Sequence, residues 1–237
     1  EITTRLVGSE MCIETDIRQG LATGDNKNFI RWWYEVEPDS IGFHCNSVAS
    51  FLNSKKQYAP YNKGGDKTKW YATSKLVIKF DEKAYKQLQQ QGNHLPSKEY
   101  YFKKGITWSL FGFNSFNVRY KEEGYVFDVS GSSLFVDDVL EKYILGYLSS
   151  NVAFFYLSAL APTVNFQVGN IANLPIIIQE DKMYEINRLV ASLINKAKFI
   201  DSQDELSWHY QANAFYINYN CAISFDENIK NYREDFL

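Results

Sequence analysis

The residues best suited to chemistry lie in one glycine-containing stretch, residues 61–71, which reads Y-N-K-G-G-D-K-T-K-W-Y. Between positions 54 and 79 there are seven lysines and a single acid, Asp66, although the formal net charge of the chain is -3. Lysines supply point charges for phosphates, glycines let a partner approach the backbone, and aromatic rings offer flat faces to bases. This combination predicts contact with a nucleic acid. The alternative is a solvated basic loop.

A second set of charged residues has the loose spacing of a nuclease. Pro38-Asp39 and Asp81-Glu82-Lys83 together resemble a PD…D-x-K pattern, which supplies two carboxylates for Mg²⁺ and a lysine for the attacking water. Asp39 follows a proline in an apparent turn, and the spacing between the two parts is long. We therefore interpret these residues as solvated charge clusters.

Other catalytic or metal-binding arrangements are not indicated by spacing. His44, His94 and His209 form no recognisable ligand or base set. Ser130-Gly131-Ser132-Ser133 lacks the G-x-S-x-G order of a nucleophile turn, so a packed turn of small residues is expected there. The cysteines are odd in number and widely spaced, which predicts neither a disulfide framework nor a zinc site.

The composition indicates a folded protein. At 237 residues, 45% hydrophobic and 22% charged, the chain can bury a substantial core. No apolar run approaches the roughly 18 residues of a membrane span, so we expect a cytoplasmic protein. The first residue is Glu1, and the sequence around it already resembles the approach to a strand, so a piece of a longer protein is expected.

The elements that would position the basic stretch are mostly strands. Strand composition or alternation is found at residues 11–18, 29–36, 75–80 and 100–111. Residues 116–120 and 125–129 are expected to form a hairpin with Gly124 in its turn. Residues 48–52 are ambiguous, and residues 82–91 are either a short exposed helix or a disordered insert.

Helical spacing dominates the second half. Apolar residues recur at helical spacing from 139 to 156, and Pro162 ends the pattern. Residues 163–168 and 171–178 have strand-like composition, and an apolar stripe over 186–197 predicts another helix. Capping patterns that begin at Ser202 and Ser224 predict two further helix starts.

Five phrases, in this order, resemble the target-recognition region of TaqI-type adenine-specific DNA methyltransferases. The similarity is greatest to the PglX-type methylase of phage-defence systems and to fused type II restriction-modification enzymes. It covers nearly the whole chain. The phrases are G-L-A-T-G-D-N-K-N-F (20–29), Y-N-K-G-G-D with K-W-Y (61–71), K-G-I-T-W-S (104–109), F-D-V-S-G-S-S (127–133) and N-F-Q-V-G-N-I-A-N-L-P-I (165–176).

The resemblance implies an α+β fold. Residues 1–178 would form a mixed-sheet target-recognition domain like that of type I restriction specificity subunits, and residues 179–237 a helical tail. The catalytic methyltransferase domain of the same polypeptide would bind S-adenosylmethionine. Adenine methyltransferases need an N-P-P-Y or D-P-P-Y tetrapeptide for the flipped base. No two of the five prolines here are adjacent, so we expect no methylation by this chain alone and no cofactor in it.

The expected partner is double-stranded DNA, with lysines and an arginine on its phosphates and polar or aromatic side chains near its bases. For Trp70, Tyr71 and Trp108 the alternative is core packing. Asn165 and Gln167 are expected on one strand face, where they could read a base edge or hydrogen-bond within the sheet. The expected DNA-binding residues are Lys55, Lys56, Lys63, Gly64, Gly65, Lys67, Lys69, Trp70, Tyr71, Lys103, Lys104, Arg119, Lys121, Asn165 and Gln167.

A different function also fits the sequence. The high aromatic content and the helical tail would suit a non-catalytic module that binds a protein or a glycan. An N-P-P-Y tetrapeptide upstream in the parent gene would favour the methyltransferase, and its absence would favour the interaction module.

Overall fold

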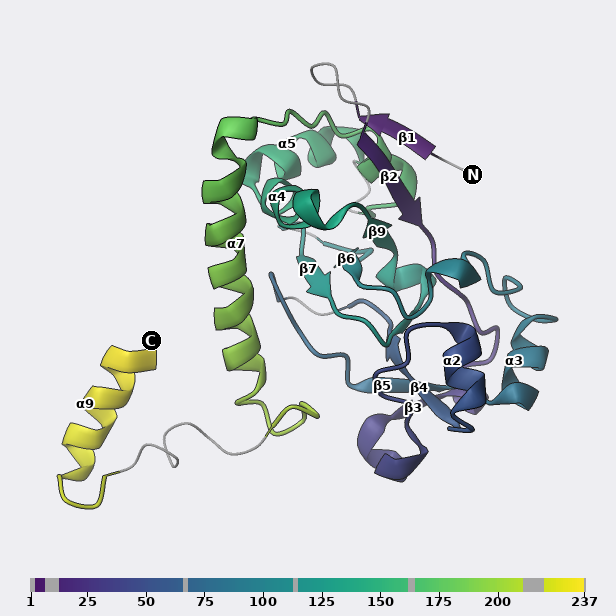
Figure 1. Cartoon of the computed structure of the whole chain (residues 1–237), viewed down its shortest axis with the longest axis horizontal. Coiled ribbons are helices and arrows are strands. Elements are labelled where there is room, and N and C mark those ends of the chain that lie inside the picture. Colours follow the sequence, from purple (N-terminus) through teal and green to yellow (C-terminus); the bar gives the residue numbers. More distant parts are fainter. Residues whose placement is uncertain are drawn as a thin grey trace.

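The fold is α+β and rests on two sheets, as a computed structural model shows for residues 3–6, 13–65, 68–112, 115–161, 165–210 and 220–236 (Figure 1). The larger sheet has five strands in the order β1-β2-β9-β6-β7, with every neighbouring pair antiparallel. Its strands are β1 (Thr3–Leu6), β2 (Ile13–Arg18), β9 (Ser133–Phe135), β6 (Gly105–Trp108) and β7 (Val118–Lys121).

The smaller sheet is mixed and has four strands in the order β3-β5-β4-β8. The pair of β4 with β8 is parallel, and the other pairs are antiparallel. The expected fold class is confirmed, since two sheets are combined with helices and a helical C-terminal part. The strands are β3 (Ile30–Trp32), β5 (Leu76–Lys79), β4 (Tyr58–Asn62) and β8 (Val126–Phe127).

The helices differ widely in length. The longest, α7, runs along one side of the molecule, while α9 is drawn apart from the rest (Figure 1). The helices are α1 (Asn26–Phe29), α2 (Val48–Asn53), α3 (Glu82–Leu88), α4 (Asp138–Leu148), α5 (Asn151–Leu160), α6 (Val168–Ala172), α7 (Glu180–Asp201) and α9 (Phe225–Phe236). Short 3-10 turns are η1 (Trp33–Glu35), η2 (Pro38–Ser40), η3 (Lys98–Tyr100) and η4 (Val129–Gly131).

One apolar core lies between the five-stranded sheet and helices α4 to α7. Trp108 of β6 is completely buried in it, and its indole N–H donates to the carbonyl of Phe166 at 2.8 Å. Ile144 of α4 packs in the same cluster as Val190 and Ile194 of α7. The first half of the expected tail therefore packs into the core of the sheet, and the expected domain boundary after residue 178 stays a prediction.

The other core, beside the four-stranded sheet, is rich in aromatic rings. Phe51 of α2 stacks on Phe102 with ring centroids 5.6 Å apart, and both rings contact Phe80 edge to face. Tyr101 meets Phe127 at a right angle, 5.4 Å between centroids. Aromatic pairs at such distances and angles add to the stabilisation by burial. Much of the high aromatic content is thus structural.

Several expected elements are confirmed. The strands predicted over 11–18, 75–80 and 100–111 correspond to β2, β5 and β6. The stripe over 186–197 lies in α7, and the backbone N–H of Glu227 donates to the Ser224 hydroxyl at 3.2 Å before α9. Residues 48–52 and 82–91 contain α2 and α3.

The predicted hairpin over 116–129 is wrong. Strand β7 pairs with β6, whereas β8 pairs in parallel with β4, so the turn at Gly124 connects the two sheets. Gly124 has a φ of +98°, and its N–H donates to the carbonyl of Phe102 at 2.9 Å. The turn residues were suited to a hairpin, but pairing with a distant strand determined the direction of the chain.

Three expectations about the second half also need correction. The helical pattern from 139 to 156 is divided into α4 and α5, which are bent by 72° where Ser150 caps α5. The strand-like residues near 171 form α6 instead, followed by irregular chain whose Ile176 is buried. Ser202 ends α7, and turns follow it to residue 209, so the expected helix does not begin there.

Among the described residues, no single helix has the length and apolar character needed to cross a membrane. The bent pair α4 and α5 meets these requirements of length and composition only when its two helices are taken together.

Candidate nucleic-acid interface

The basic loop begins at the end of β4, where two polar side chains are buried. The hydroxyl of Tyr61 donates to the carboxylate of Asp128, and burial together with that carboxylate raises the tyrosine pKa well above its ordinary value. The side-chain amide of Asn62 donates to Thr107 Oγ1 at 2.8 Å, and also to the carbonyl of Gly131 at 3.3 Å. Buried polar groups are costly unless they are bonded, so this network fixes the point at which the chain leaves the sheet.

The two glycines of the loop have different roles. Gly64 has a φ of +68°, and a Cβ at this position would lie 2.1 Å from the carbonyl oxygen of Ser130. Gly65 has a φ of +90°, and a Cβ there would lie within 4 Å of no atom of the described residues. Close packing thus requires Gly64, while only the left-handed backbone conformation favours Gly65. Lys67, predicted to contact DNA, lies outside the described residues.

The returning part of the loop joins the edge of the five-stranded sheet. The N–H of Trp70 donates to the carbonyl of Val118 at 2.9 Å, and its carbonyl accepts from Tyr120 N–H at 2.8 Å. The ring of Trp70 is half-buried against the core. Lys69 extends to the carbonyl of Ser149, with Nζ 3.3 Å away. The loop therefore runs from the four-stranded sheet to the five-stranded one.

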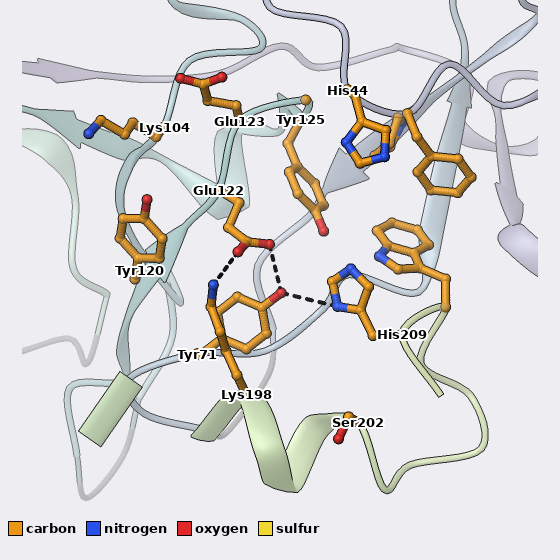
Figure 2. A pocket seen from close by; sticks show the side chains of 14 residues that line it. His44, Tyr71, Lys104, Tyr120, Glu122, Glu123, Tyr125, Lys198, Ser202 and His209 are labelled. Atoms are coloured by element: carbon orange, nitrogen blue, oxygen red, sulfur yellow. Dashed lines mark hydrogen bonds and ion pairs between the residues drawn. The ribbon is translucent and has the colours of Figure 1, made fainter. Parts of the chain in front are cut away.

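A cavity of about 640 Å³ lies beside the end of the loop, between β7, α7 and the turns after α7 (Figure 2). In Figure 2 the carboxylate of Glu122 lies between the ammonium of Lys198 and the hydroxyl of Tyr71. The same hydroxyl lies 3.4 Å from His209 Nδ1. The lysines lining the cavity are Lys104 and Lys198, and the carboxylates are Glu122 and Glu123, so the charges balance.

The pKa values of two groups in this cavity are shifted in opposite directions. Burial, followed by the nearby Glu122 carboxylate, raises the pKa of Tyr71. Burial alone would raise the pKa of Glu122, but the hydrogen bonds from Lys198 and Tyr71 outweigh it and hold this pKa below its ordinary value. An ionised Glu122 thus ties α7 to β7 and orients Tyr71. The arrangement suits a structural support better than an anion site.

Among the described residues, no group of three or more His, Cys, Asp or Glu side chains could hold a metal ion. Of the loose nuclease pattern, Asp81 caps α3 by accepting from the N–H of Ala84 at 2.9 Å. Glu82 pairs with Lys86 at 2.6 Å on the same helix. Local helix contacts account for these residues, in agreement with the solvated interpretation.

The second basic group is not gathered on one surface. Arg119 and Lys121 are two residues apart on β7 and are both buried. Nη1 of Arg119 lies 3.2 Å from Ser109 Oγ and 3.4 Å from the carbonyl of Thr68. The ammonium of Lys121 donates to the carbonyl of Lys103, and burial lowers its pKa to about 7. Neither charge lies at the surface where a phosphate could meet it.

The surface lysines of the prediction lie in separate places. Lys103 is exposed, with its ammonium 4.9 Å from the ring centre of Tyr100, and Lys104 pairs with Asp138 at 2.8 Å. Lys55 is exposed at the end of α2, with a φ of +57°. Nζ of the adjacent Lys56 donates to the carbonyl of Asp39 at 2.5 Å.

Asn165 and Gln167 do not share a strand face. Asn165 forms an isolated bridge with Phe111, whereas Gln167 is exposed and precedes α6. The backbone N–H of Gln167 donates to the side chain of Asn170 at 2.9 Å. The strand that would have aligned the two amides is replaced by the start of a helix.

The structure also brings Lys63 close to residues that are not among the expected DNA-binding residues. Lys63 lines an open hollow of about 550 Å³ with Lys27 and Arg31. Trp32 belongs to the same lining, and its ring is 43% exposed. The run F-I-R-W-W-Y was interpreted only as a strand, and these cations are far from the lysine-rich window in the sequence. The available sequence signal for this hollow is a tryptophan adjacent to an arginine in a predicted strand.

Comparison with known proteins identifies relatives along most of the chain. It is 32% identical over 209 residues to the adenine-specific methyltransferase PglX of Lacticaseibacillus casei, which covers 85% of this chain. It is 28% identical over 241 residues to the adenine-specific methyltransferase BrxX of Escherichia coli, which covers 92%. Its homologues are adenine-specific methyltransferases. No family model matches the sequence.

The chain is much shorter than these relatives. It spans 17% of the length of the Lacticaseibacillus protein and 19% of the Escherichia protein. The chain thus corresponds to one part of a larger protein in each relative.

Proposed function

We propose that this chain recognises a sequence of duplex DNA as the specificity region of an adenine-specific DNA methyltransferase of a phage-defence restriction-modification system. The similarity to two adenine-specific methyltransferases over most of the chain carries this proposal. The tetrapeptide that such enzymes use to hold the flipped adenine is absent from this sequence. A region that belongs to the same protein as the catalytic domain but lacks the catalytic tetrapeptide is suited to selecting the DNA sequence that is methylated.

The basic loop and the lysines near it provide the proposed contacts with phosphates. Lys63 and Lys69 lie near the two ends of the basic loop, and Lys55 and Lys103 have exposed side chains. Lysines position a protein on the duplex without reading its sequence, because every phosphate is alike. Sequence would be read by side chains that reach the base edges between these phosphate contacts.

The proposed partner within the polypeptide is the catalytic methyltransferase domain, which would bind S-adenosylmethionine. More than four fifths of each relative lies outside the region of similarity, so a large neighbour is available. Helix α5 exposes several large apolar side chains that a neighbouring domain would cover. These side chains are Val152, Phe155, Tyr156 and Leu160.

Selection from a pool of random duplexes tests the proposed function. The chain, immobilised at low ionic strength, is expected to enrich one recurrent motif over several rounds. Lys63→Ala should weaken capture of every duplex by a similar factor, because a phosphate contact is not sequence-specific. Lys86→Ala is the matched control, since Lys86 is exposed on α3 and its ammonium pairs with Glu82 of the same helix. Recovery of an unenriched pool would contradict the proposal.

A further inference from the structure

The hollow beside Lys63 combines positive charge with an exposed aromatic surface. It lies at the edge of the four-stranded sheet, where β3 is an outer strand, and has a volume of about 550 Å³. Its residues come from α1, from β3 and the turn after it, from β5, and from the start of the basic loop. Those that carry charge or an aromatic ring are Lys27, Arg31, Trp32, Glu35 and Lys63.

The aromatic part of the lining is Trp32 at the end of β3, and Tyr34, which is outside the lining, supports it from the turn that follows. The 3-10 turn η1 brings Trp32 and Tyr34 together as a stacked pair, with centroids 5.9 Å apart and an interplanar angle of 10°. The two side chains are 43% and 51% exposed. The adjacent Trp33 has a structural role, because its indole N–H donates to the carbonyl of Leu206 at 2.8 Å. Large rings that are exposed and already stacked offer a flat platform to a ligand.

The charged part is oriented by backbone groups. Nη1 of Arg31 donates to the carbonyls of Lys27 and Ile30 at 2.6 and 2.7 Å, which holds the guanidinium beside the hollow. Glu35, the acidic residue of the lining, accepts from the backbone N–H of Trp32 at 2.9 Å. The lining therefore has Lys27, Arg31 and Lys63 against one carboxylate. This excess of positive charge favours an anion next to the ring platform.

We propose that this hollow holds one extrahelical nucleotide of the bound DNA, with its base on Trp32 and its phosphate near Arg31 and Lys63. A phosphate and a base are separated by one sugar, so they can occupy the cationic and aromatic parts together. Base faces are hidden within an intact duplex, and an exposed indole gains a stacking partner only when a base leaves the helix. The inference rests on the proposed function and adds a non-catalytic nucleotide site to it.

The experiment compares a fully paired duplex with one that carries a single bulged 2-aminopurine, with the full 237-residue chain and anisotropy as the measure of affinity. The wild-type chain is expected to bind the bulged duplex about tenfold more tightly, within the usual range for base stacking on an aromatic side chain. The 2-aminopurine emission should fall on binding as the base stacks. Trp32→Leu should remove both effects, whereas Trp32→Phe should retain much of them.

The control variants separate this site from general surface effects. Tyr184→Ala removes an exposed ring from α7, 81% exposed and outside the hollow, and should leave the bulge preference unchanged. Lys63→Ala should weaken binding of both duplexes and reduce the quenching. Thermal unfolding of each variant establishes that the fold is retained.

The outcomes distinguish this inference from the proposed function. Binding of both duplexes with equal affinity, unaffected by Trp32→Leu, would overturn the nucleotide site and leave duplex recognition standing. Failure to bind either duplex would overturn both. If Trp32→Leu retained the quenching of the bound bulge, the base would stack elsewhere, and the assignment of the nucleotide to this hollow would be wrong.

Discussion

Replacement of Lys121 by methionine should stabilise the protein at neutral pH. The ammonium of Lys121 is buried, donates to the carbonyl of Lys103, and lies 5.7 and 5.4 Å from the ring centres of Phe127 and Phe135. Burial lowers its pKa from 10.5 to about 7, against the opposing effect of Glu141. At about 1.4 kcal/mol per pKa unit, burial of the charged amine costs on the order of 5 kcal/mol.

The sign of the pH dependence follows from the lowered pKa. Between pH 7 and 10.5 the folded protein has released the Lys121 proton while the unfolded chain still holds it. The unfolding free energy of the wild type therefore rises with pH in this window, by up to about 1.4 kcal/mol per pH unit. The cost is complete below pH 7, so the advantage of Lys121→Met should be greatest there and should decline towards pH 10.

Urea unfolding of the wild type and Lys121→Met at pH values from 6 to 9.5 measures this difference. Titration of the other groups contributes equally to both proteins, so it cancels in the comparison. Lys103→Met is the control, because the Lys103 side chain is exposed and its backbone carbonyl is unchanged. A difference in unfolding free energy that is independent of pH would refute the reasoning. It would indicate a solvated amine, which could then contact DNA.

Two further substitutions test how the loop and α7 are held. Gly64→Ala should destabilise the fold by more than Gly65→Ala, because only at position 64 would the added Cβ press against Ser130. Both glycines have a positive φ, and the left-handed backbone alone costs about 1–2 kcal/mol with a side chain present. Equal losses of unfolding free energy in urea would contradict this prediction. Asp201→Ala should lower the unfolding free energy by about 1–3 kcal/mol, because the Asp201 carboxylate accepts a hydrogen bond from Thr73 N–H at 2.9 Å. Amide hydrogen exchange at the end of α7 should become faster. Unchanged exchange would contradict the view that this hydrogen bond holds the end of α7.

Local sequence patterns predicted the helices and strands whose formation is determined by the residues within them. Alternation and β-branched residues located β2, β5 and β6, and the Ser224 capping pattern located the start of α9. These signals act over a few residues, so neighbouring sequence carries them. The periodicity of α7 was equally local, and a single stripe along the helix packs on α4.

The errors arise where a distant partner decided the structure. Gly124 suited a hairpin turn, but β8 pairs with β4, which lies more than sixty residues earlier in the chain. The helical period from 139 to 156 does not reveal that Ser150 begins a new helix at a sharp angle. Such choices depend on tertiary packing, which no short window of sequence contains.

The candidate interface shows the same division. Charge density located the loop that begins at Lys63, but counting charges could not show that Arg119 and Lys121 are buried within the fold. Nor could it show that Lys27 and Arg31 lie beside Lys63, because the proximity depends on β3 pairing with β5. Sequence thus located one part of the basic surface, and the fold determined which charges accompany it.

The central claim is most directly tested by the salt dependence of duplex binding by the full chain. We expect log Kobs to fall linearly with log salt concentration. Lys63→Ala and Lys69→Ala should each reduce the slope by about 0.9 for every phosphate that the variant no longer neutralises. Lys86→Ala should leave the slope unchanged. Absence of salt-sensitive binding at low ionic strength, or equal slopes for all of these proteins, would contradict the assignment of the loop to DNA.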